Sequence, residues 1–156
     1  MMRIRVLAVG TRMPTWVSTG VDDYQRRMPR DFPVEWIDIP PAKRQGEPVP
    51  KLMAKEAATI KRQLKAGERL IVLDVAGRLL DTEAMAENMS QWQQSGGSAA
   101  IVIGGPDGTD PSLLAQADLC WSLGRITMAH PLVRVVLAEQ LYRVWSIIAQ
   151  HPYHRS

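Results

Sequence analysis

The sequence predicts an α/β fold with a mainly parallel sheet and helices on both faces of that sheet. Continuous apolar runs at residues 70–73 and 99–103, the second within a strand predicted over 98–103, lack the alternation of a half-exposed strand, which is typical of strands buried on both faces. Helical segments separate the predicted strands, and this alternation favours parallel crossovers. No internal repeat, low-complexity segment or linker is visible, so we expect one domain over residues 1–156.

The first half of the chain contains two strand–helix pairs. Residues 4–9, apolar except for one arginine, precede a glycine, which predicts a strand, and a helix is expected over 14–28, where a proline follows. Apolar and polar residues alternate over 33–39, which predicts the second strand. A proline suits the first turn of the next helix, expected over 50–66 before a glycine. The intervening residues 42–49 are expected to form a mobile loop.

The second half of the chain continues the alternation. The buried strand at 70–73 precedes a helix over 81–94, whose first residue, an aspartate, is the expected N-cap. The buried strand at 98–103 precedes a glycine turn and a short helix over 111–118, which an Asp-Pro pair begins. A short strand at 119–123 follows.

The final helix is expected to begin at Pro131 or Leu132 and to reach about Gln150. Apolar residues occupy most of its circumference, and such a helix needs two covering surfaces. One is its own sheet, and the other is expected to be a second subunit, although another helix of the same chain would also serve. The apolar positions are Leu132, Val133, Val135, Val136, Leu137, Leu141, Val144, Trp145, Ile147 and Ile148.

Composition excludes several classes of protein. The single cysteine, Cys120, excludes an internal disulfide and suits a reducing cytosol, and no CxxC or HExxH spacing supports a metal site. No apolar run approaches the roughly 18 residues of a membrane span, and no targeting segment is visible, so a cytoplasmic protein is expected. A pI near 9.3 suits nucleic acid, but a net charge of +3 leaves any RNA affinity to local clusters.

The excess positive charge lies toward the carboxyl end of the chain. Residues 1–120 hold 15 Lys and Arg against 15 Asp and Glu, whereas 121–156 hold four Arg, one Glu and all three histidines. A neutral body with a cationic, histidine-bearing end suggests a site for an anionic partner.

Glycine turns follow the two buried strands. Gly104 and Gly105 end one strand, and Leu73 leads to Gly77 beyond the other. Neither turn has the P-loop pattern or the GxGxxG spacing of a dinucleotide fold. Glycines there permit close backbone approach at the carboxyl edge of the sheet, where ligands of open parallel sheets bind. The apolar segment 123–128 suits a third wall that holds an adenine ring, although a buried connection is the simpler interpretation.

Five short motifs occur in order along the chain: LAVG at 7–10, IVIGGP at 101–106, HPLVR at 130–134, AEQLYR at 138–143 and HPYHR at 151–155. With these motifs the chain resembles, over its full length, the family of ribosomal large-subunit methyltransferases that methylate N3 of a pseudouridine in 23S rRNA, within the SPOUT superfamily. The resemblance implies a C-terminal trefoil knot, a homodimer, S-adenosylmethionine (SAM) as methyl donor and the assembled ribosome as substrate. The cofactor site that it implies consists of Leu73, Gly104, Gly105, Leu123, Gly124, Arg125, Ile126, Thr127 and Met128.

The implied reaction requires a site that stabilises an anion. N3 of pseudouridine is an imide nitrogen, so its proton must leave before or during methyl transfer. Cationic donors would stabilise the charge that develops on the flanking carbonyl oxygens, and a histidine would suit a proton acceptor. The candidate catalytic residues are Glu139, Arg143, Tyr153, His154 and Arg155.

Simpler roles for the residues of this end stay open. Glu139 and Arg143 could be a helix-surface pair, and the last residues could be frayed chain, although a proline and a tyrosine among them favour docking. His130 and Arg134 are the candidate substrate-binding residues. His130 could instead orient the helix start, whereas a cation at position 134 gains nothing from the helix dipole, which favours a role for it.

Two other kinds of function also stay open. The same fold could methylate a ribose 2′-hydroxyl or a tRNA base, or the chain could be a non-catalytic ribosome-binding assembly factor. SAM binding separates the last possibility from the enzymes, and mapping of the methyl mark separates the enzymes from one another. An assembly factor would use the basic residues Lys43, Arg44, Lys51, Lys55, Lys61, Arg62 and Lys65, which equally suit a solvated helix face.

Overall fold

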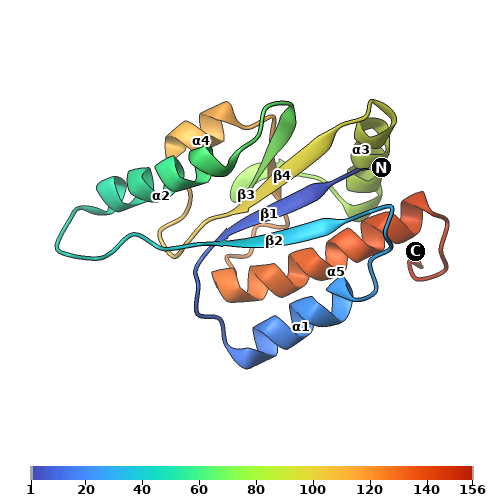
Figure 1. Cartoon of the computed structure of the whole chain (residues 1–156), viewed down its shortest axis with the longest axis horizontal. Helices are drawn as coiled ribbons and strands as arrows, with labels where there is room; N and C mark the ends of the chain where they lie inside the picture. Colours follow the sequence, from blue (N-terminus) through green and yellow to red (C-terminus); the bar gives the residue numbers. More distant parts are fainter. Residues whose placement is uncertain (1, 156) are drawn as a thin grey trace.

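The computed structural model describes residues 2–155. Within these residues, five strands form one sheet in the order β2-β1-β4-β3-β5, and every neighbouring pair is parallel. The strands are β1 (Ile4–Val9), β2 (Val34–Ile39), β3 (Glu68–Leu79), β4 (Ser98–Ile103) and β5 (Leu119–Ser122). The helices are α1 (Thr15–Gln25), α2 (Val49–Gln63), α3 (Thr82–Gln94), α4 (Pro111–Gln116) and α5 (His130–Ile148). The predicted parallel α/β fold is confirmed (Figure 1).

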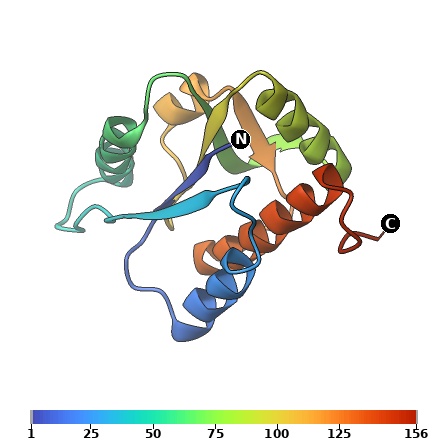
Figure 2. The same ribbon diagram turned by 45° about the vertical axis from the view of Figure 1, so that its right-hand side comes forward.

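Helices cover both faces of the sheet, as predicted. On one face α5 packs against α1 and α3, and on the other face lie α2 and α4 (Figure 1 and Figure 2). Side chains of β1 alternate between two buried clusters. Val6 belongs to the cluster that contains Met85 and Leu137, whereas Leu7 belongs to the cluster that contains Ile60. The alternation follows from the two-residue period of a strand, which points successive side chains to opposite faces.

The bounds of most elements lie close to those predicted. β1 and β4 begin and end at the predicted residues. Asp81 caps α3 by accepting a hydrogen bond from the backbone N–H of Ala84 at 2.8 Å, and Asp110 caps α4 through the N–H of Ser112 at 3.0 Å. α1 and α2 end three residues before the predicted positions, since a turn follows α1 and Leu64 adopts extended backbone after α2.

The prediction for β3 was too short. A strand was expected over 70–73, but β3 is 12 residues long and pairs twice with Trp121 of β5, on either side of a bulge at 74–77. The bulged residues leave the ladder, which explains why they resemble a turn in the sequence. Gly77 is required in the bulge, because a Cβ there would lie 2.7 Å from the carbonyl oxygen of Cys120.

The final helix, α5, is covered in part by the sheet and in part by its neighbours α1 and α3. Leu137, Leu141 and Val144 are buried. Leu132 is 39% exposed, and Trp16 at the start of α1 is 57% exposed. Another helix of the same chain therefore supplies some of the cover that a second subunit was expected to give. The dimer and the trefoil knot stay predictions.

Candidate functional site

A cavity of about 600 Å³ lies at the carboxyl ends of β3, β4 and β5. Its walls come from the bulge in β3, the glycine turn after β4 and the segment that joins β5 to α5. The volume is in the range of small-molecule pockets. The position is the edge at which ligands of open parallel sheets bind.

The cavity brings together most of the residues that the resemblance assigns to a cofactor. Arg125 is the exception, because its guanidinium donates a hydrogen bond to the carbonyl oxygen of Val75 and so links two walls. Ser122 also links them: its hydroxyl lies 3.0 Å from the same carbonyl and 2.9 Å from that of Gly124. The predicted residues that line the cavity are Leu73, Gly104, Gly105, Leu123, Gly124, Ile126, Thr127 and Met128.

Sequence analysis missed several lining residues, among them Asp74 and Val75 of the bulge and Thr109. The glycine turn after Leu73 indicated a ligand-binding edge at this point, but not which side chains of the turn line the cavity. Thr109 was foreseeable, because it directly follows the Gly-Gly-Pro-Asp-Gly turn. A Cβ at Gly104 would lie 2.5 Å from the Thr109 hydroxyl and 3.0 Å from the carbonyl carbon of Gly108. Gly104 is therefore required by the fold of the turn, and a bulky residue there would distort the wall as well as fill the cavity.

His130, the first residue of α5, lines the same cavity. Its Nδ1 atom is buried and has no hydrogen-bond partner among the described residues. Burial lowers the pKa of His130, and the nearby positive charge of Arg134 lowers it further. The imidazole is therefore neutral near pH 7, and its Nδ1 is unpaired among the described residues although it is closed off from solvent.

Arg134 is buried, with 5% exposure, and does not line the cavity. Its Nη2 donates to the carbonyl oxygen of Gly10 at 2.8 Å, and its Nη1 donates to Asp38 Oδ1 at 2.7 Å. These bonds tie the first turn of α5 to the carboxyl ends of β1 and β2. Arg134 thus ties α5 to the sheet, and its predicted role in substrate binding stays a prediction.

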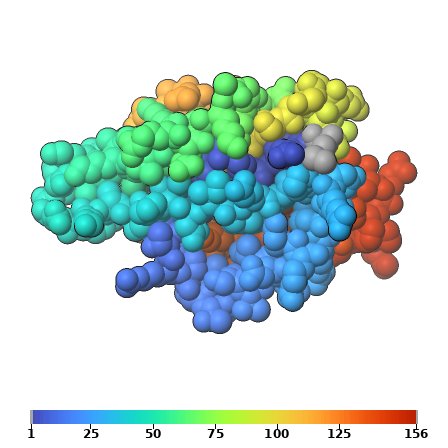
Figure 3. All heavy atoms as spheres, in the orientation of Figure 1, coloured from blue at the N-terminus to red at the C-terminus, as the bar shows by residue number. Residues whose placement is uncertain are grey.

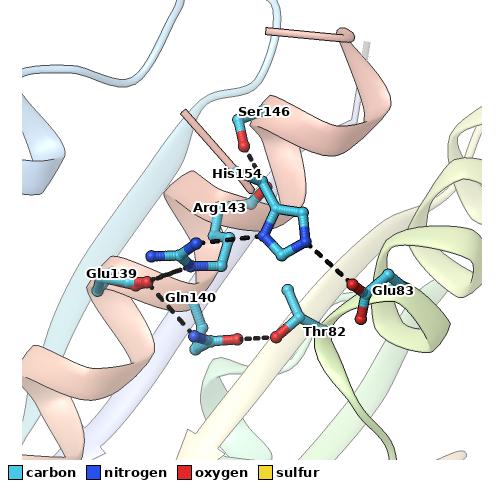
Figure 4. Close-up of polar contacts among 7 residues, drawn as sticks. All are labelled: Thr82, Glu83, Glu139, Gln140, Arg143, Ser146 and His154. Atoms are coloured by element: carbon cyan, nitrogen blue, oxygen red, sulfur yellow. Dashed lines mark hydrogen bonds and ion pairs between the residues drawn. The ribbon is translucent and has the colours of Figure 1, made fainter. Parts of the chain in front are cut away.

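The carboxyl-terminal tail, residues 149–155, docks on α5, and Figure 4 shows three of the candidate residues there, Glu139, Arg143 and His154. Glu139 Oε1 accepts a hydrogen bond from Arg143 Nε at 2.6 Å, which raises the pKa of Arg143. Arg143 Nη1 lies 3.2 Å from His154 Nδ1, and the Arg143 Cζ atom lies 4.8 Å from the Tyr153 ring centroid. The fifth candidate, Arg155, is exposed. The structure thus joins Glu139, Arg143, Tyr153 and His154 in one cluster, and the tail is not frayed.

The hydrogen bonds of His154 determine its tautomer. Arginine only donates hydrogen bonds, so the ring nitrogen that faces Arg143 must accept. The proton must then be on Nε2, which donates to Glu83 Oε1 at 3.0 Å. Both nitrogens of a neutral imidazole are used in this way. In this arrangement His154 has no lone pair left with which to take a proton from a substrate.

Glu83 is a member of the cluster that sequence analysis missed. It lies in the first turn of α3, and 71 positions separate it from His154. Its own backbone N–H and the bond to His154 lower the pKa of Glu83. A neighbouring contact joins α3 to α5 itself, because Thr82 Oγ1 donates to Gln140 Oε1 at 2.8 Å (Figure 4). An acid in a first turn is common, so only the tertiary contact identifies Glu83.

The cavity lies at the start of α5, whereas the tail cluster lies along α5 from its middle onward. Arg143 follows His130 by 13 residues, which separates them by roughly 20 Å along the helix axis at 1.5 Å per residue. In Figure 3 the tail lies on the surface at one end of the molecule, and residues 40–50 lie at the other end. One chain therefore does not bring the two predicted halves of the site together.

Residues 2–155 contain neither a cluster of metal ligands nor a helix suited to crossing a membrane. In this part of the chain, no group of three or more His, Cys, Asp or Glu side chains is placed to hold a metal ion. No helix among the same residues combines the length and the apolar character needed to cross a membrane.

Known proteins similar to this chain match it along nearly its whole length. A family model described as "Predicted SPOUT methyltransferase" matches residues 2–154. Three relatives, each named ribosomal RNA large subunit methyltransferase H, are 50% identical (Chromohalobacter salexigens), 45% identical (Hahella chejuensis) and 43% identical (Marinomonas sp.). Each comparison covers 99% of this chain and 99 to 100% of the relative.

Proposed function

Because the chain belongs to the SPOUT methyltransferase family, we propose that it transfers a methyl group from SAM to N3 of a pseudouridine in 23S rRNA of the assembled ribosome. The names of relatives that are 43 to 50% identical support an rRNA substrate. One observation carries the proposal. A single cavity at the carboxyl edge of the sheet is lined by almost all the residues that the resemblance assigns to the cofactor.

The residues of the cavity suit SAM. The side chains of Leu73, Leu123 and Met128 supply apolar walls for an adenine ring. Gly104 and Gly105 line the cavity, and the tight packing of their backbone against Thr109, Gly108 and Val9 fixes the shape of this wall. The bound cofactor would supply an electrophilic methyl group on a sulfonium centre.

The tail cluster suits the charge that develops on the target base. Loss of the N3 proton places negative charge on the two flanking carbonyl oxygens, and Arg143 and Arg155 offer guanidinium donors for them. Glu139 holds Arg143 from one side, and His154 contacts it from the other. Tyr153 offers an aromatic ring on which the base could stack. The cluster would therefore position and stabilise the anionic base.

His130 is the stronger candidate for proton acceptor. It lines the cofactor cavity, it is neutral near pH 7, and no described residue occupies its Nδ1. His154 is committed to Arg143 and Glu83. A base needs an available lone pair within reach of the proton that it removes; His130 Nδ1 is unpaired among the described residues, and substrate binding would have to expose this buried atom.

A homodimer would unite the two halves of the site. If two α5 helices pack antiparallel, the tail of one subunit lies beside the cavity of the other, which removes the separation of roughly 20 Å that 13 helical residues impose within one chain. The exposed apolar residues Trp16 and Leu132 lie at the starts of α1 and α5, which pack together. Burial of these side chains against a second copy would stabilise such a dimer.

Mass mapping of methylated ribosomes tests the proposal. Ribosomes from cells that lack this enzyme are incubated with the purified protein and SAM, and the 23S rRNA is digested and sequenced by mass spectrometry. We expect one added methyl group, at N3 of a pseudouridine. Naked, unmodified rRNA fragments should react poorly, because a net charge of +3 gives weak phosphate attraction at physiological salt.

Each other outcome favours a different function. A methyl group on a ribose 2′-hydroxyl or on tRNA would replace the proposed target with the second candidate. Ribosome binding without SAM binding would indicate the assembly factor. Equal methylation of naked, unmodified fragments would contradict the requirement for the assembled particle.

A further inference from the structure

A second cavity, of about 350 Å³, lies at the opposite edge of the sheet from the cofactor cavity. It is formed where β1, β2, β3 and β4 begin. In Figure 3 the start of β1, in dark blue, is recessed between the residues of β2 and the green and yellow residues of β3 and β4. No part of the proposed methyl-transfer site lies in this second cavity, so its composition requires a separate explanation.

Three exposed cations from three separate segments meet at this cavity: Arg3, Arg30 and Lys65. Arg3 precedes β1, Arg30 lies between α1 and β2, and Lys65 lies between α2 and β3. None of the three forms an ion pair with another residue in the range 2–155. Glu35 is the one exposed acid among the described residues that line the cavity. The exposed charges around this second cavity, which we call the basic cleft, therefore sum to a positive value.

The floor of the basic cleft is electrically neutral and fixed. The side chains of Arg5 and Glu68 there are only 8% and 6% exposed and form two hydrogen bonds of 2.7 Å. Burial opposes ionisation of Glu68, but the bond from Arg5 holds the pKa of that carboxyl below its ordinary value. Glu68 also accepts the backbone N–H of Lys65 at 2.8 Å, which fixes the backbone of that residue beside the cleft. Because the buried acid is already satisfied, it does not neutralise the three cations above it.

We propose that the basic cleft binds backbone phosphates of the rRNA substrate. Separate long cations on a shallow surface suit an extended polyanion, since phosphate contacts need charge and reach more than fixed geometry. Figure 1 shows the N-terminal end of β1 and the C-terminus at the same end of the molecule. RNA held at the tail cluster would therefore extend toward the basic cleft. This inference rests on the proposed function, in which the tail contacts the target base.

The experiment compares two triple variants that remove the same charge. The cleft variant carries Arg3→Gln, Arg30→Gln and Lys65→Gln. The control variant carries Lys51→Gln, Lys55→Gln and Lys61→Gln, which removes three exposed lysines of α2 that already contact Glu47 or Ser112. Ribosome affinity is measured by sedimentation at several salt concentrations, and KM for ribosomes and kcat are measured by methylation.

We expect the cleft variant to bind ribosomes about tenfold more weakly, since each exposed contact with a phosphate contributes modestly. Its log–log salt slope should be smaller by about 2, at roughly 0.7 per lost phosphate contact. KM should rise while kcat and SAM affinity stay unchanged. A charge-preserving variant with Arg3→Lys, Arg30→Lys and Lys65→Arg should bind as the wild type does.

Three results would overturn the proposal. These are wild-type affinity in the cleft variant, equal weakening in the control variant, and weakening without a change in salt slope, which would indicate a protein contact. The binding measurement does not depend on catalysis. If the wild type binds ribosomes through the basic cleft yet transfers no methyl group, the proposed methyl transfer is wrong and the proposed phosphate binding by the basic cleft stands.

Discussion

Replacing His154 by Gln would separate two roles that a histidine could have at this position. His154 accepts a hydrogen bond from Arg143 at 3.2 Å and donates one to Glu83 at 3.0 Å. The amide of Gln offers one acceptor and one donor on neighbouring atoms, but it does not take up a proton near neutral pH. His154→Gln can therefore keep the alignment of Arg143 while it abolishes any base chemistry.

The expected effect on rate follows from the hydrogen bonds. Both ring nitrogens are occupied, so we expect His154→Gln to keep the rate within about tenfold of wild type, whereas a lost general base costs about 10²- to 10⁴-fold. His154→Leu, which offers neither bond, should lose more, because Arg143 is released. His130→Gln should show the larger loss of a missing base. The wild-type rate should fall as pH drops through a pKa below the ordinary histidine value, because burial and Arg134 lower the pKa of His130.

The assay is single-turnover methylation of ribosomes with enzyme and SAM in excess, from about pH 5 to about pH 9, which spans histidine titration. SAM affinity and melting temperature serve as controls for folding. The argument is refuted if His154→Gln loses the acid limb of the pH profile and more than about 100-fold in rate while both controls are unchanged. His154 would then be the proton acceptor.

Three other substitutions test separate parts of the structure. Leu123→Ala should raise the SAM dissociation constant about tenfold by calorimetry, because it removes apolar wall, whereas Leu79→Ala, at an exposed position outside the cavity, should leave it unchanged. Equal SAM affinities of the two variants would show that SAM does not bind against Leu123. Arg134→Met should lower the free energy of unfolding, measured in urea, by about 2 kcal/mol. The loss is smaller than for a fully buried ion pair because the Asp38 carboxylate is half-exposed. An unchanged free energy of unfolding would show that Arg134 does not hold α5 in place. Val136→Glu should convert a dimer to a monomer in sedimentation, since it buries an unpaired charge, and a wild type that is already monomeric at micromolar concentration would contradict the dimer.

Local signals predicted most of the fold. Asp81 and Asp110 lie where helices begin, and their side chains accept the expected backbone hydrogen bonds. The continuous apolar run at 99–103 belongs to β4, which is buried on both faces. The bulge at 74–77 could not be predicted, because its residues look like a turn until the second pairing with Trp121 is known.

The candidate site was less accessible to sequence reasoning, because its contacts join distant parts of the chain. Local pattern indicated a cleft after Leu73 and Gly104, and the resemblance supplied the remaining cofactor residues. Arg134 was noticed as a cation in an unfavourable position, yet its bonds to β1 and β2 depend on the tertiary structure. Glu83 gave no signal, since its partner His154 is 71 residues away.

The separate placement of the cavity and the tail along α5 has a consequence for mixtures of chains. If each site takes its cavity from one subunit and its tail from the other, a chain with a blocked cavity and a chain with a defective tail are both inactive alone. A dimer of one of each contains one intact site and one doubly defective site. Random reassortment makes half of the dimers mixed, so two inactive proteins would together recover about a quarter of wild-type activity. Defects that act within a single chain's site would show no such intragenic complementation.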